Sequence, residues 1–155
     1  MYNEINVHAV CIEKQERWLL CMGYVISCSS TCDLDNEHVR ARNIQYIPFH
    51  YALDGKALLD DFGASVSMDD FYTAMDHGAD TRTSQINEDE YTSFFETFLR
   101  DGQDILHVDL STGISGTINS ARLAQEKLQI KYPDRKIYVI DSLGASSGYG
   151  LLMDE

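Results

Sequence analysis

The sequence predicts an α/β domain of three layers, in which a mainly parallel sheet lies between helices. Short apolar runs alternate with helical patterns, and small polar loops follow two of these runs. A chain of 155 residues is long enough for one domain with a core, and neither an internal repeat nor a Pro/Gly/Ser-rich linker divides it. We expect the α/β domain at residues 23–155. Residues 1–22 would be an extension of doubtful origin, because Met22 could itself be the natural start.

Four apolar runs have the length and residue types of buried strands. They lie at residues 23–27, 44–50, 105–110 and 136–140. Asp54-Gly55 is a hairpin signal, so a β-excursion is expected at residues 51–59.

Helices are expected between the strands. The strongest pattern follows Asn87 as N-cap, with Glu90 at the third helical position and Gly102 at the end. Its apolar stripe, expected in the core, is Tyr91, Phe94, Phe95, Phe98 and Leu99. Further helices are predicted at residues 36–42, 68–77, 117–128 and from 145 to the end, whereas Thr83-Ser84-Gln85 is expected in a loop.

Composition excludes several classes of protein. A net charge of −13 disfavours nucleic acid or an anionic membrane surface as partner, because both require a basic surface. Cys28 and Cys32 lack the second pair of ligands that a zinc site needs, so no metal is expected. Neither a secretory signal nor a membrane-spanning run is visible, which predicts a cytoplasmic protein without stable membrane insertion.

The loop at residues 111–117 is the strongest chemical signal. It places two glycines and four hydroxyl residues between a strand and a helix N-terminus, where free amides and the helix dipole favour an anion. No lysine follows Gly116, so the loop is not a P-loop, and it also lacks the G-x-G-x-x-G and G-x-S-x-G spacings. A phosphate site, a carboxylate site and a purely structural turn all remain compatible with this pattern.

Four segments together resemble the signatures of the DegV family of bacterial proteins. They are S-T-C-D-L at residues 30–34, T-S-Q at 83–85, L-S-T-G-I-S-G-T at 110–117, and D-S at 141–142 followed by Ala145, Gly148, Gly150, Leu151 and Leu152. They occur in the family's order, and the resemblance covers residues 23–155. The departures are Ser29 in place of the family aspartate and Ile86 in place of the usual proline.

The resemblance implies a binding protein for one long-chain fatty acid, not an enzyme, with no further cofactor. The acyl chain would lie in an apolar tunnel between two domains, of which this chain holds the N-terminal one, incomplete at its C-terminal end. The carboxylate would accept hydrogen bonds from Thr83 and Ser115. Supporting contacts are expected from Ser84, Gly116, Thr117, Ser30 and Arg82. The implied partner is a separate fatty-acid kinase, to which the bound acid is presented.

Two alternatives stay open beside the carrier. One is a subunit related to dihydroxyacetone kinases that binds a phosphorylated or hydroxylated small molecule. Those kinases attach their substrate to a histidine, and none stands in the anion loops. The other is an inactive truncated fragment.

Overall fold

The computed structural model describes residues 23–154, so the expected extension at residues 1–22 lies outside the described part, as does Glu155. The main sheet has four parallel strands in the order β2-β1-β6-β7. Their bounds are β1 (Tyr24–Ser29), β2 (Gln45–Ile47), β6 (Asp104–Asp109) and β7 (Ile137–Asp141). The predicted α/β class with a mainly parallel sheet is confirmed.

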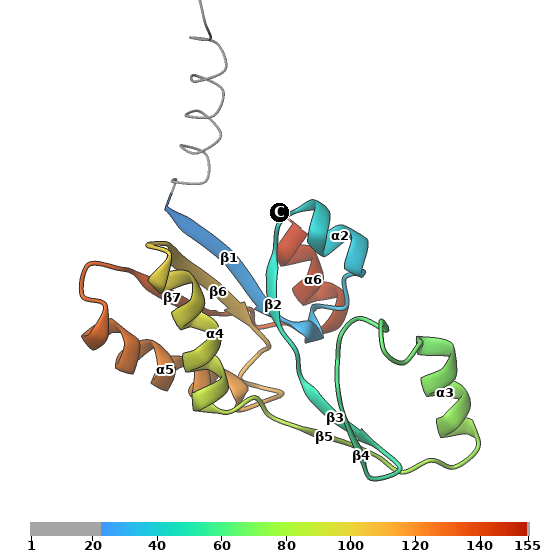
Figure 1. Cartoon of the computed structure of the whole chain (residues 1–155). Helices are drawn as coiled ribbons and strands as arrows, with labels where there is room; N and C mark the ends of the chain where they lie inside the picture. Colours follow the sequence, from blue (N-terminus) through green and yellow to red (C-terminus); the bar gives the residue numbers. More distant parts are fainter. Residues whose placement is uncertain (1–22, 155) are drawn as a thin grey trace, which may run out of the picture.

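Helices cover both faces of this sheet, as the three-layer prediction requires (Figure 1). α4 (Glu88–Arg100) and α5 (Thr117–Lys131) lie over one face. α2 (Asn36–Ala41) and α6 (Ser146–Asp154) lie on the other side, where α6 packs against the short 3-10 helix η1 (Ser30–Cys32). The described helices therefore follow the expected order, with bounds that differ by a few residues.

A second, smaller sheet stands apart from the first (Figure 1). It is antiparallel in the order β4-β3-β5, with β3 at His50–Leu53, β4 at Lys56–Leu59 and β5 at Thr81–Ser84. Helix α3 (Met68–Asp76) connects β4 to β5, and Ser67 caps it by accepting a hydrogen bond from the amide of Asp70. We call residues 50–84 the excursion.

The expected single strand at residues 44–50 is wrong, because the structure divides it into β2 and β3. Pairing with β1 ends at Ile47, and the next residue, Pro48, has no amide to continue the ladder. The amide of Phe49 then donates to the hydroxyl of Ser30 at 3.0 Å. The chain turns there from the parallel sheet into the antiparallel one.

The expected loop at Thr83-Ser84-Gln85 is also wrong for its first two residues, which end β5. Two hydrogen bonds of 2.9 Å between Asp54 and Asp80 align β5 with β3, from Thr81 opposite Leu53 to Ser84 opposite His50. This edge strand has no buried residue, so the apolar alternation that signals a strand is missing from its sequence.

The core lies between the parallel sheet and helices α4 and α5. The capping box of α4 is formed as expected, with hydrogen bonds of 2.8 and 3.0 Å between Asn87 and Glu90. Of the predicted stripe, Tyr91, Phe95 and Leu99 are buried, whereas Phe94 and Phe98 are half-buried at its edge. Burying three large side chains contributes about 1.5–3 kcal/mol each.

Candidate functional site

The loops after β1 and β6 open at the same edge of the main sheet. β1 and β6 are parallel neighbours in register from Tyr24 opposite Asp104 to Cys28 opposite Val108, so their carboxyl ends meet. η1 follows β1, and the loop at residues 111–116 follows β6. This is the edge at which open α/β sheets bind ligands.

The loop at residues 111–116 folds back on itself before α5 begins. The amide of Ser115 donates to the carbonyl of Ser111 at 3.1 Å, and the Ser115 hydroxyl accepts from the amide of Thr117 at 3.2 Å. The amides of Gly116 and Ile118 have no hydrogen-bond partner within residues 23–154. Two free amides at the start of a fifteen-residue helix suit an anion.

Gln85 brings the T-S-Q segment against this loop. A Cβ placed on Gly116 would lie 3.3 Å from Gln85 Nε2 and 3.4 Å from its Oε1, so the amide side chain lies on the bare backbone of this glycine. Two segments that are separated by some thirty residues in the chain are thus neighbours. Thr83 lies two residues before this contact, at the end of β5.

Thr83 lines an apolar cavity of about 220 Å³ within the excursion. Most of its wall is apolar, from Phe49, Tyr51, Val66, Met68 and Phe71, and Thr31 adds a second hydroxyl from η1. Asp60 and Asp61 also line it, and the Asp61 carboxylate accepts a hydrogen bond from the amide of Ser65 at 3.1 Å. The volume is below the ~300–1,000 Å³ that is usual for ligand pockets.

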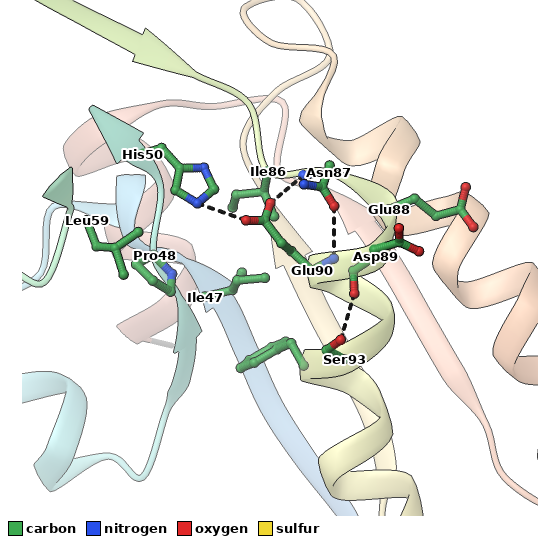
Figure 2. Close-up of a pocket in the computed structure, with 11 residues that line it drawn as sticks. Ile47, Pro48, His50, Leu59, Ile86, Asn87, Glu88, Asp89, Glu90 and Ser93 are labelled. Carbon is green, nitrogen blue, oxygen red and sulfur yellow. Dashed lines mark hydrogen bonds and ion pairs between the residues drawn. The ribbon is translucent and has the colours of Figure 1, made fainter. Parts of the chain in front are cut away.

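A second, more open cavity of about 630 Å³ lies between β2, β3, β4 and the start of α4. Figure 2 shows His50 and Glu90 pointing toward each other across it, with Nε2 and Oε1 2.9 Å apart. Its floor includes Ile47 and Ile86, and its rim carries the acidic residues at the start of α4. Because His50 lines both cavities, its contact with Glu90 stands at the border between them.

Three residues that were expected to support the carboxylate contact, Ser30, Arg82 and Ser84, have other partners or face away from the cavity. Ser30 is buried, and its hydroxyl is engaged by the amide of Phe49. Arg82 pairs with Asp80 at 3.0 Å and is mostly exposed. Because side chains alternate along a strand, Arg82 and Ser84 lie on the face of β5 opposite to Thr83. Neither is brought to the apolar cavity.

Thr117 is fully buried and turned inward, although the resemblance assigns it a supporting contact. Its hydroxyl lies 3.3 Å from the hydroxyl of Tyr91, which donates to Asp109 Oδ2 at 2.7 Å. Burial alone would raise the pKa of Asp109, but the neighbouring His107 and the Tyr91 hydroxyl outweigh it and hold the pKa below its ordinary value. Burial and the Asp109 charge raise the pKa of Tyr91, which therefore remains a donor.

Sequence reasoning missed three contributors to this edge. Thr31 and Gln85 belong to recognised signatures, but nothing in their sequence positions indicated a cavity wall or a glycine contact. Asp141 is held beside the loop because its Oδ2 accepts from the Thr112 hydroxyl at 2.7 Å. That hydrogen bond, together with the amide of Leu143, lowers the pKa of Asp141.

Neither a metal-binding cluster nor a membrane-spanning helix is found among the described residues. Across residues 23–154, His, Cys, Asp and Glu side chains do not gather into a group that could hold a metal ion. Within the same range, every helix is too short or too polar to cross a bilayer.

Fold and site define a class: an α/β domain in which free amides at the N-terminus of a helix lie near a hydroxyl-bearing apolar cavity. The model of the DegV family, described as an uncharacterised protein family, matches residues 25–155. The chain belongs to the DegV family.

Relatives of known sequence or structure extend this result. A DegV domain-containing protein of Clostridium perfringens is 32% identical over 130 residues, which are 84% of this chain and 45% of the relative. A stearic acid-binding protein from Eubacterium ventriosum is 30% identical with a TM-score of 0.76, over 84% of this chain and 45% of that one. The Streptococcus pneumoniae Fatty Acid Kinase (Fak) B3 protein, solved with linoleic acid, is 28% identical with a TM-score of 0.68, over 86% and 46%. The chain thus spans about half the length of these proteins.

Proposed function

We propose that this chain binds a long-chain fatty acid and holds its carboxylate between Thr83 and the loop that carries Ser115. The observation that carries the proposal is the contact of Gln85 with Gly116, because it joins the strand of Thr83 to the N-terminus of α5. Hydroxyl and amide donors can hold a carboxylate there without a paired cation.

The acyl chain would occupy the apolar cavity that Thr83 lines. Each methylene that leaves water contributes about 0.8 kcal/mol, so the tail supplies most of the affinity. The cavity of about 220 Å³ is small for a whole long acyl chain, which supports the proposal that a further domain closes the site in a protein of the relatives' length.

Binding, not catalysis, suits the chemistry of Ser115. Among residues 23–154 its hydroxyl is hydrogen-bonded to the amide of Thr117 alone, so no base is positioned to activate it as a nucleophile. We therefore propose a carrier that presents the acid to a separate fatty-acid kinase, as the name of the Streptococcus pneumoniae relative suggests. The chain incubated alone with oleate and ATP is expected to release no ADP.

The test compares oleate binding by isothermal titration calorimetry in the wild type and in Thr83→Ala with Ser115→Ala. Losing two hydrogen bonds to a charged acceptor costs about 1.5–3 kcal/mol each, so affinity should fall by about a hundredfold or more. Thr97→Ala with Ser147→Ala removes the same two hydroxyls from exposed positions and serves as control. Unchanged affinity in a folded double variant would reject Thr83 and Ser115 as carboxylate ligands, and a wild type that binds no oleate would reject the proposed function.

A further inference from the structure

A chain of buried polar groups lies beneath the loop at residues 111–116. Asp109, Tyr91 and Thr117 have no exposed surface, and they come from three different elements: the end of β6, the first turn of α4 and the start of α5. A buried carboxylate is costly unless its oxygens are hydrogen-bonded, so its partners identify what it holds in place.

The two oxygens of Asp109 reach both ends of the loop. Oδ1 accepts from the amide of Leu110 at 2.8 Å, directly before the loop begins. Oδ2 accepts from the Tyr91 hydroxyl at 2.7 Å, and that hydroxyl lies 3.3 Å from Thr117 Oγ1, directly after the loop ends.

The direction of these hydrogen bonds follows from their donors. An ionised carboxylate can only accept hydrogen bonds, so the single hydroxyl proton of Tyr91 is donated to Asp109. Tyr91 then has only a lone pair to offer Thr117, whose hydroxyl must be the donor. This fixes the rotamer of the first residue of α5, whose amide donates to the Ser115 hydroxyl.

A buried histidine, His107, also lies next to the Asp109 carboxylate. Its Nδ1 lies 2.9 Å from the Ser27 hydroxyl, and its Nε2 lies 3.6 Å from Asp109 Oδ2 without a closer partner within residues 23–154. The imidazole and Tyr91 rings lie edge to face, with their centroids 5.5 Å apart. The carboxylate is therefore confined between β6 and α4.

We propose that Asp109 and Tyr91 are positioning residues that clamp the two ends of the 111–116 loop, and so hold Ser115 where it can receive the carboxylate. The clamp requires no contact between ligand and either residue. Its role in affinity rests on the proposed function, whereas its role in ordering the loop does not.

The test is a double-mutant cycle between Tyr91→Phe and Ser115→Ala, measured as oleate affinity. Tyr91→Phe removes only the hydroxyl that joins Asp109 to Thr117, and is expected to weaken oleate binding about five- to tenfold. In the Ser115→Ala background the same change should cost less than about twofold, because the group that it positions is gone. An equal loss in both backgrounds would mean a general structural effect and would overturn the proposal.

Tyr132→Phe is the matched control, because its hydroxyl donates to Glu96 at 2.8 Å on the distant side of α4. Amide hydrogen exchange of the ligand-free proteins adds a measurement that needs no fatty acid. Tyr91→Phe should speed exchange at residues 111–118, and Tyr132→Phe should leave it unchanged. If the wild type bound no oleate, the proposed function would fail while exchange still decided the clamp, and unaltered exchange in Tyr91→Phe would refute it.

Discussion

The main sheet and the excursion differ in how completely their side chains are buried. Every buried residue of the described chain lies in the parallel sheet, its helices or the loops that adjoin them, including the fully buried Phe95 and Ile118. From His50 to Ser84 no residue is buried, and the aromatic and aliphatic side chains there are only partly covered. The site lies where these two regions meet.

Under the proposed function, this difference in burial assigns the head group of the ligand to one region and the acyl chain to the other. A rigid sheet can fix the loop that we propose as the head-group site, because the carboxyl ends of the strands and the start of α5 are set by the core. The excursion presents apolar surface that its own residues do not cover, and the bound acyl chain would supply the missing burial. We expect the excursion to become more ordered when a fatty acid binds.

Removing one aromatic ring from each region is expected to show the difference in packing most clearly. Phe95→Ala in the core should destabilise the protein by about 3–5 kcal/mol, because it leaves a cavity among Tyr91, Phe94 and His107. Phe71→Ala in the excursion removes a half-buried ring at the edge of Tyr51 and should cost about 1 kcal/mol. Urea unfolding measures both, and equal losses would show that the excursion is packed like the core.

The pH dependence of stability compares one carboxylate of the core, Asp109, with one of the excursion, Asp61. The folded-state pKa of Asp109 is lowered, so its ionised form stabilises the fold above its unfolded pKa of about 3.9, and this contribution is lost as pH falls through the folded pKa. Asp109→Asn should therefore cost about 1.5–3 kcal/mol at pH 7, and the gap to the wild type should narrow below about pH 4.

Asp61 in the excursion is the control for this measurement. Its pKa is also lowered, because hydrogen bonds from Ser65 and Ala64 outweigh the opposing effect of burial. Asp61→Asn should change the unfolding free energy by about 0.5 kcal/mol or less at neutral pH. Denaturant unfolding at several pH values compares the two variants, and a gap for Asp109→Asn that does not vary with pH would contradict the assignment of its charge.

The last comparison concerns two glycines of α6. A Cβ on Gly150 would collide with the carbonyl oxygen of Cys32 in η1, so Gly150→Ala should cost about 1–3 kcal/mol. A Cβ on Gly148 would meet nothing within 4 Å, and Gly148→Ala should stabilise the helix by up to about 1 kcal/mol. Thermal unfolding separates them, and two variants of equal stability would show that α6 can shift away from η1 and accommodate the added methyl group.

Most of the main domain could be predicted from the sequence because its signals are local. Asn87 and Glu90 stand at the spacing of a capping box, and the aromatic stripe after them repeats at the helical period. The apolar runs of β1, β6 and β7 are short and continuous, which is typical of strands buried between two layers of helices. The loop between β6 and α5 was predicted in the same way, since its glycines and hydroxyls are contiguous.

The excursion could not be predicted as well, since its strands depend on pairing and not on pattern. Thr83 and Ser84 read as part of a polar loop, and they end a strand because Asp54 and Asp80 fix β5 along β3. The division of residues 44–50 into two strands combines a local signal, Pro48, with a distant one, the Ser30 hydroxyl that accepts from the amide of Phe49.

The sequence by itself therefore determined the α/β class, the order of the helices and the capping box of α4, because periodicity and capping act over a few residues. Only the tertiary structure decided that Gln85 lies on Gly116, that Thr83 faces a cavity while Arg82 faces away, and that Asp109 reaches both ends of the loop. These contacts join segments that are distant in the chain, and their geometry follows from how sheets and helices pack, which no local pattern records.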